Sequence, residues 1–126
     1  MPYRVLLVDD SPLIRKLLRS WLQQQPEWVV CGEAENGREG VDKVLELHPD
    51  VVLLDLQMPV MDGMEAARQI GLLAPQVGMK IGIVMCTMHA SPQLSHDAKA
   101  VGISEVVCKS ETRPDSLLAA LRRACA

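Results

Sequence analysis

The sequence predicts an α/β fold in which a parallel sheet is covered by helices. Two observations favour this fold class. Short runs of β-branched or aliphatic residues alternate with amphipathic stretches five times along the chain. The run at Val51–Leu54 is apolar on both faces, as a strand buried between two helix layers must be. We therefore expect five strand–helix units that form one domain over residues 1–126.

The first unit begins with the apolar run Arg4–Val8, which we expect to be a strand. Ser11 provides an N-cap, and Pro12 suits the first position of a helix. An apolar stripe with helical spacing follows and ends before Pro26. The stripe consists of Leu13, Ile14, Leu17, Leu18, Trp21 and Leu22.

The second and third units carry similar signals. A strand is expected at Val29–Gly32, and Asn36 can cap the helix that follows it. The apolar positions of that helix are Val41, Val44 and Leu45. The third strand is Val51–Leu54, and its helix is expected from about Met64 to Leu73.

The fourth strand is expected at Lys80–Cys86, and its helix at Pro92–Val101, where Gly102 ends it. The fifth strand is expected at Glu105–Cys108, and the last helix begins near Pro114. The apolar residues of that helix are Leu117, Leu118 and Leu121.

Composition limits the classes of function. The chain has 126 residues, enough for one hydrophobic core, and only 2% are aromatic, so the core must be aliphatic. A net charge of −3 and the lack of stacking aromatics argue against direct contact with nucleic acid or an anionic membrane. The four cysteines form no C-x-x-C pair, which argues against a thiolate metal site. Without a signal-peptide pattern or a membrane-length apolar run, we expect a cytoplasmic location.

Polar residues gather where the expected strands end. Ligands bind outside the carboxyl ends of the strands in an open parallel sheet, so these residues should share one site. They are Asp9, Asp10, Asp55, Thr87 and Lys109. Crowded carboxylates repel one another, and a divalent cation offsets this cost. Oxygen ligands of this kind suit Mg²⁺, which completes its coordination with water and phosphate.

These residue types also suit phosphoryl transfer. A carboxylate can act as a nucleophile and form an aspartyl phosphate. The Lys109 ammonium can bind one phosphoryl oxygen, and the Thr87 hydroxyl can donate to another. Together with a metal ion, these groups would balance the charge of a phosphoryl group during transfer.

Four segments resemble the receiver domains of bacterial two-component response regulators. They are Val8–Ser11, Leu54–Gly63, Thr87–His89 and Cys108–Ser110, and the resemblance covers essentially the whole chain. It implies a flavodoxin-like fold with strand order 2-1-3-4-5. It also implies a signalling domain that catalyses its own phosphorylation and dephosphorylation. A sensor histidine kinase or phosphotransfer protein would be the phosphodonor, and an output domain, a partner or a homodimer would respond.

The resemblance assigns a role to each site residue. Asp55 matches the phosphoacceptor, Asp10 a direct Mg²⁺ ligand, and Asp9 a ligand that acts mainly through water. Gln57 would offer its backbone carbonyl to the metal.

The remaining roles concern the phosphoryl group and its lifetime. Thr87 matches the switch hydroxyl and Lys109 the phosphate-binding lysine, while Gln57 and His89 would tune the lifetime of the phosphorylated state. In this family an aromatic residue is expected two positions before the lysine, where its rotation reports phosphorylation. The residue there is Val107, so we expect that part of the switch to be missing.

The run Thr87-Met88-His89 and the pair Lys109-Ser110 look most like the nitrate-regulator-type subgroup. Receivers of that subgroup commonly precede a helix-turn-helix DNA-binding domain of the LuxR type. Transcription would be the regulated process if such a domain follows in the full-length protein.

Two alternatives remain open from the sequence. The first is an aspartyl-phosphate hydrolase of the haloacid-dehalogenase kind, although Asp9-Asp10-Ser11 lacks the Asp-x-Asp spacing of that family and no cap domain is present. The second is an interaction module that no longer responds to phosphate. Val107 favours that alternative, whereas the intact set of acidic residues, threonine and lysine argues against it.

Overall fold

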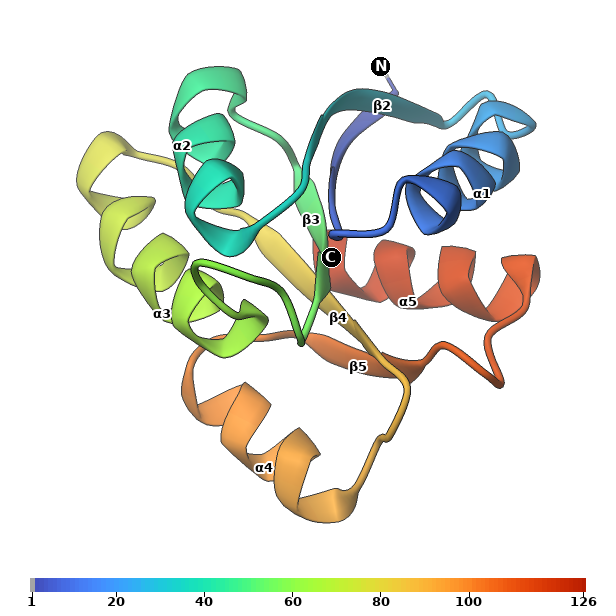
Figure 1. The fold of residues 1–126 in the computed structure, drawn as a ribbon. Coiled ribbons are helices and arrows are strands. Elements are labelled where there is room, and N and C mark those ends of the chain that lie inside the picture. Colours follow the sequence, from blue (N-terminus) through green and yellow to red (C-terminus); the bar gives the residue numbers. More distant parts are fainter. Residues whose placement is uncertain (1) are drawn as a thin grey trace.

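The computed structural model describes residues 2–126 and contains a five-stranded parallel sheet with the order β2-β1-β3-β4-β5 (Figure 1). The predicted flavodoxin-like class and strand order are therefore confirmed. The strands are β1 (Tyr3–Val8), β2 (Trp28–Ala34), β3 (Val51–Asp55), β4 (Gly82–Thr87) and β5 (Glu105–Cys108). The helices are α1 (Pro12–Gln23), α2 (Gly37–Leu47), α3 (Gly63–Leu73), α4 (Pro92–Ala100) and α5 (Pro114–Cys125), with a short 3₁₀ helix, η1 (Pro75–Val77).

Helices cover both faces of the sheet (Figure 1). One face packs against α1 and α5 through an aliphatic cluster that includes Leu7, Leu22 and Leu121. The other packs against α2, α3 and α4 through a cluster that includes Leu54 and Met85. All five residues of β3 are buried, as expected for a strand between two helix layers. The sheet is thus fixed from both sides, and polar groups at its edge are held by a rigid scaffold.

Side-chain caps begin four of the helices. Ser11 and Asn36 accept hydrogen bonds from the amides of Ile14 and Glu39, which confirms the two caps expected from the sequence. Asp62 and Ser91 cap α3 and α4 in the same way. A cap satisfies an N–H group that the helix itself leaves unpaired and so fixes where each helix starts.

The apolar stripe of α1 is less buried than expected. Leu18 and Leu22 are buried, but Leu13 is 74% exposed and Leu17 is 44% exposed. Leu13 lies in the first turn of α1, next to the carboxyl edge where the sheet ends, and so meets little of the core. Periodicity identified the helix correctly but overestimated the width of its buried face.

The strand bounds also differ from expectation. β4 begins at Gly82 rather than Lys80 and extends to Thr87, because its register starts opposite Val51, the first residue of β3. β2 is longer than predicted at both ends, since Trp28 and Ala34 pair with the two ends of β1. The 3₁₀ helix η1 was not predicted.

Among residues 2–126, no helix has the length and hydropathy that crossing a membrane requires.

Candidate functional site

The carboxyl ends of β1, β3 and β5 bring four charged side chains together. Asp9, Asp10 and Asp55 each place a carboxylate oxygen within 4.8 Å of the others. The Lys109 Nζ atom lies 2.9 Å from Asp9 Oδ2 and 3.0 Å from Asp55 Oδ1. Asp9 and Asp55 are only 3% and 7% exposed, whereas Asp10 is exposed. The structure therefore unites the acidic residues and the lysine that the sequence placed at this edge.

Backbone contacts at the end of β1 hold the acidic pair in place. The amide of Asp9 donates to the Ala34 carbonyl, which continues the pairing of β1 with β2. The amide of Ser11 then donates to Asp9 Oδ1 at 2.9 Å. Asp9 is consequently bound through both carboxylate oxygens, one by Ser11 and one by Lys109.

A glycine allows α3 to start directly against the end of β3. The amide of Gly63 donates to the Leu56 carbonyl at 2.8 Å. A Cβ atom at position 63 would lie 2.2 Å from the Asp55 carbonyl oxygen, so only glycine permits this approach. Asp62 and Gly63 are the N-cap and the first residue of α3. Close backbone contact, rather than a positive φ, is the reason for the glycine.

The charges at the site affect one another. Burial raises the pKa of Asp55, and the charge of Asp9 adds to this effect, while the Lys109 ammonium opposes it. Burial lowers the pKa of Lys109, but hydrogen bonds to Asp9 and Asp55 outweigh it and raise the pKa above its ordinary value. Lys109 therefore remains an ammonium at neutral pH.

Thr87 closes the other side of the site. It is the last residue of β4, it is buried, and its Oγ1 accepts a hydrogen bond from the His89 amide at 3.3 Å. Its carbonyl accepts from the Lys109 amide at 2.7 Å, which ties the lysine to the end of β4. An open pocket of about 560 Å³ lies between these groups. It is lined by Asp10, Asp55, Leu56, Gln57, Thr87, Met88, His89, Leu94 and Lys109.

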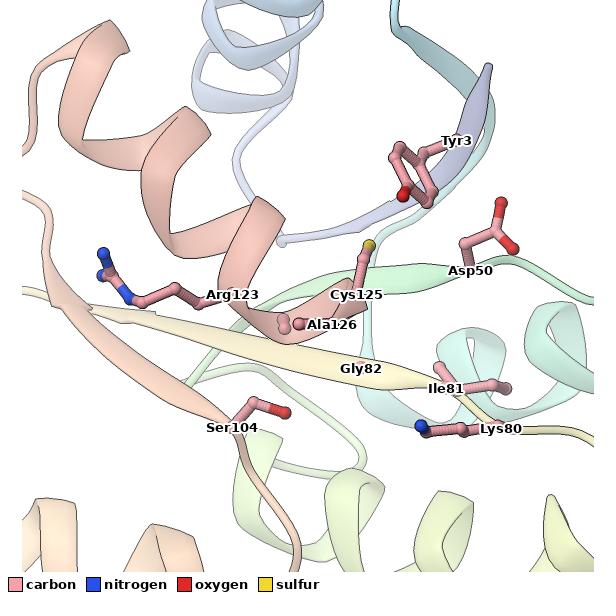
Figure 2. Close-up of a pocket in the computed structure, with 10 residues that line it drawn as sticks. Tyr3, Asp50, Lys80, Ile81, Gly82, Ser104, Arg123, Cys125 and Ala126 are labelled. Atoms are coloured by element: carbon pink, nitrogen blue, oxygen red, sulfur yellow. The ribbon is translucent and has the colours of Figure 1, made fainter. Parts of the chain in front are cut away.

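A second hollow, of about 260 Å³, lies at the opposite, amino ends of the strands (Figure 2). Tyr3, Asp50, Gly82 and Ser104 border it, together with the end of α5. It is smaller than the pocket at the carboxyl edge, and the cluster of three aspartates belongs to the carboxyl edge. The carboxyl edge is also where ligands bind in folds of this kind.

Val107 lies on the face of β5 that is turned away from α4. Val107 packs with the cluster under α1 and α5, whereas Val106 packs with the cluster under α3 and α4. Residues in a strand alternate between faces, so a ring at position 107 would point away from α4. The position that faces α4 is 106, and it is also a valine. Residues 105–108 contain no aromatic residue, so the expected lack of an aromatic ring in β5 holds at either position.

The donor set fits a magnesium ion. Three carboxylates supply hard oxygen ligands, and the open pocket leaves room for phosphate and water.

One residue next to the site, Arg15, was not expected from the sequence. It donates a hydrogen bond to the Asp9 carbonyl. Nothing in the pattern of α1 distinguished this arginine from a solvent-exposed helix residue.

Comparisons with known proteins bear on the family of the chain. The model of the family described as the response regulator receiver domain matches residues 5–122. A protein-glutamate methylesterase/protein-glutamine glutaminase of Methanosarcina mazei is 38% identical over 115 residues, which cover 89% of this chain and 30% of that protein. The chain thus spans less than a third of that relative.

Two solved structures are similar over nearly the whole chain. The response regulator domain of Thermotoga maritima CheB has a TM-score of 0.89 and 30% identity, with 99% of this chain and 97% of that chain covered. A LuxR-family two-component response regulator from Aurantimonas has a TM-score of 0.87 and 30% identity, with 97% and 84% covered. The family rules out the haloacid-dehalogenase alternative. The chain belongs to the response regulator receiver domains, the modules of phosphorylation-dependent two-component signalling.

Proposed function

We propose that residues 1–126 act as a single receiver domain in which Asp55 accepts a phosphoryl group from a sensor histidine kinase or a phosphotransfer protein. The observation that carries the proposal is the position of Asp55. Its carboxylate is buried at the end of β3, within an acidic cluster, and 3.0 Å from the Lys109 ammonium. A nucleophile next to a fixed positive charge is what the transfer of a negatively charged group requires.

Each side chain has a separate part in the transfer. A carboxylate oxygen of Asp55 attacks the phosphorus, and an O–P bond forms while the bond to the donor's nitrogen breaks. Lys109 binds a phosphoryl oxygen through its ammonium. Thr87 accepts from the His89 amide, so its own hydroxyl hydrogen is available to donate to a second phosphoryl oxygen.

Asp9, Asp10 and Asp55 are the proposed magnesium ligands, and the Gln57 backbone carbonyl is proposed as a further one. We assign direct coordination to Asp10 and Asp55, and coordination through water to Asp9, whose oxygens are already bonded to Ser11 and Lys109. When bound, Mg²⁺ neutralises charge on the phosphoryl oxygens.

Labelling with a small phosphodonor tests the acceptor. With acetyl phosphate and Mg²⁺, intact-mass spectrometry should find one added phosphoryl group on the wild-type protein and none on Asp55→Asn. Asp42→Asn, an exposed carboxylate of α2, is the matched control and should label like the wild type. Equal labelling of Asp55→Asn would contradict the assignment.

Gln57 and His89 are proposed to set the lifetime of the phosphorylated state. Both line the pocket beside Asp55, where water would approach the acyl phosphate. Exchange of either for alanine should change the autodephosphorylation rate by several-fold while the Mg²⁺ affinity stays nearly constant, because only backbone atoms of Gln57 would contact the metal. Wild-type decay rates in both variants would show that neither residue acts on the water.

The output is proposed to be a protein-glutamate methylesterase, as in the curated relative. The support is 38% identity over 89% of this chain. That activity would then lie outside residues 1–126. The nitrate-regulator-type subgroup, with a DNA-binding output, is the second candidate, and it is supported by the LuxR-family structure and by the Thr87–His89 motif. The coding sequence after residue 126 distinguishes the two outputs.

A further inference from the structure

Arg15 in α1 makes two contacts that reach the acidic site. Its Nη1 donates to the backbone carbonyl of Asp9, and its Nε donates to Glu33 Oε1 at 3.0 Å. The side chain of Arg15 is only 15% exposed. The planar guanidinium thus links the end of β2, through Glu33, to the peptide that joins Asp9 to Asp10.

Arg19 provides an internal comparison. It lies one turn further along α1 and binds the same glutamate, through Nε at 2.9 Å and Nη2 at 2.6 Å to Oε2. The hydrogen bonds of Arg19 reach Glu33, whereas the bond to the Asp9 carbonyl comes from Arg15. Burial raises the pKa of Glu33, but the hydrogen bonds from Arg19 and Arg15 outweigh it, and the pKa lies below its ordinary value. Glu33 is therefore an ionised anchor for both arginines at neutral pH.

The Asp9–Asp10 peptide connects two proposed metal ligands. The Asp9 carboxylate is fixed by Ser11 and Lys109, but Asp10 is exposed and follows directly in the chain. The direction of its carboxylate consequently depends on the orientation of that peptide. Loss of a partner that orients a metal ligand typically lowers metal affinity by about 10- to 100-fold.

We propose that Arg15, anchored by Glu33, is a positioning residue for the metal site: it fixes the Asp9–Asp10 peptide so that the Asp10 carboxylate faces the cation. The inference rests on the proposed function, because it presupposes that Mg²⁺ binds at this cluster. It assigns a role to a side chain that touches neither the metal nor the phosphoryl group.

The charge of Arg15 and its contacts have opposite effects on metal binding. A positive charge near the cluster repels a cation, so its removal alone would tighten Mg²⁺ binding. Loss of the bond to the Asp9 carbonyl would loosen the Asp10 carboxylate and weaken binding. Lysine retains the charge but lacks the planar guanidinium that contacts the Asp9 carbonyl and Glu33 at the same time. The sign of the change in affinity therefore separates the two effects.

The experiment is a Mg²⁺ titration followed by amide chemical shifts, for the wild type, Arg15→Gln, Arg15→Lys and Arg19→Gln, at a temperature where all four are folded. We expect a weakening of about 10-fold for both Arg15 variants, the lower end of what loss of such a partner causes. Arg19→Gln should remain within about two-fold of the wild type, because the hydrogen bonds of Arg19 go to Glu33 and not to the Asp9–Asp10 peptide.

A second readout needs no metal. In the metal-free protein, the backbone ¹⁵N shift of Asp10 should move in both Arg15 variants and stay in place in Arg19→Gln, since Arg15, unlike Arg19, donates to the carbonyl of that peptide. An unchanged or tighter Mg²⁺ affinity in Arg15→Gln would overturn the inference, as would equal weakening by Arg19→Gln. Absence of Mg²⁺ binding in the wild type would instead overturn the proposed function, and the inference with it.

Discussion

The three carboxylates of the site have different surroundings, although their oxygens lie within 4.8 Å of one another. Asp9 is buried and bonded through both oxygens, Asp10 is exposed, and Asp55 is buried beside Lys109. These surroundings suit the three proposed roles. A carboxylate whose oxygens are already bonded suits coordination through water, an exposed one suits direct coordination of the cation, and a buried one next to an ammonium suits the nucleophile.

The raised pKa of Asp55 predicts a cost in stability. When the folded-state pKa lies above the unfolded-state value, the native protein binds more protons in that interval, so stability falls as the pH rises through it. Asp55→Asn should therefore increase the free energy of unfolding at pH 7 without metal. Urea denaturation tests this, and the gain should shrink as the pH falls toward about 4, where the unfolded carboxyl titrates.

Asp42→Asn removes an equal but exposed charge of α2 and should change the stability little. A lower stability of Asp55→Asn at pH 7 would contradict this prediction. It would mean that the ion pair with Lys109 stabilises the wild-type protein more than burial of the Asp55 charge destabilises it, contrary to the raised pKa of Asp55.

At the scale of elements, the site depends on how closely α3 approaches β3. Gly63→Ala would place a Cβ atom 2.2 Å from the Asp55 carbonyl oxygen, so the helix or the strand end must move. We expect a loss of about 2–3 kcal/mol in unfolding free energy, in the range of overpacked core positions. Mg²⁺ binding should weaken as well, because the displaced backbone carries Asp55.

Gly71→Ala is the matched control for that prediction. Gly71 lies in the same helix, is exposed, and has space for a Cβ atom, whose nearest neighbour would be the Val101 carbonyl oxygen at 3.6 Å. The free energy of unfolding of Gly71→Ala should be about 0.5–1 kcal/mol higher than that of the wild type, because alanine is more favourable than glycine inside a helix. Chemical denaturation measures both changes. A neutral Gly63→Ala would show that the contact with β3 relaxes without cost.

The sequence predicted the elements better than their burial and bounds. Alternating apolar runs identified all five strands, because each strand is a short hydrophobic segment between polar ones. The start of β4 depended on its register with β3, and the exposure of Leu13 depended on where the sheet ends. Both are tertiary facts that a local pattern does not contain.

At the scale of the molecule, the strand-end rule predicted which residues would meet. Parallel strands place their carboxyl ends at one edge, so Asp9, Asp55 and Lys109 converge although they lie far apart in the sequence. The rule could not identify Arg15, because this residue lies in α1 and not at the end of a strand. It also could not tell which face of β5 each valine occupies.

The faces of β5 that Val106 and Val107 occupy indicate how a conformational change caused by phosphorylation would spread. Phosphorylation must bias an element that has two arrangements, through contacts that differ between them. Thr87 and the loop that begins at Met88 lie next to the pocket and can respond directly. Val106 faces α3 and α4 but is β-branched and stiff, without a ring that could swing between two positions. The change should therefore pass from Thr87 into α4 and reach β5 only weakly.

Amide chemical shifts with Mg²⁺, with and without beryllofluoride as a phosphate mimic, test this path. We expect large beryllofluoride-induced changes from Met88 to Val101 and small ones from Glu105 to Val107. Val106→Tyr should extend the changes into β5, because its ring would lie on the face of α4, whereas Val107→Tyr should not, because position 107 packs toward α1 and α5. Uniformly large changes across α4, β5 and α5 in the wild type would show that valine suffices for the coupling. An equal response of the two tyrosine variants would show that the face of the strand does not determine the path.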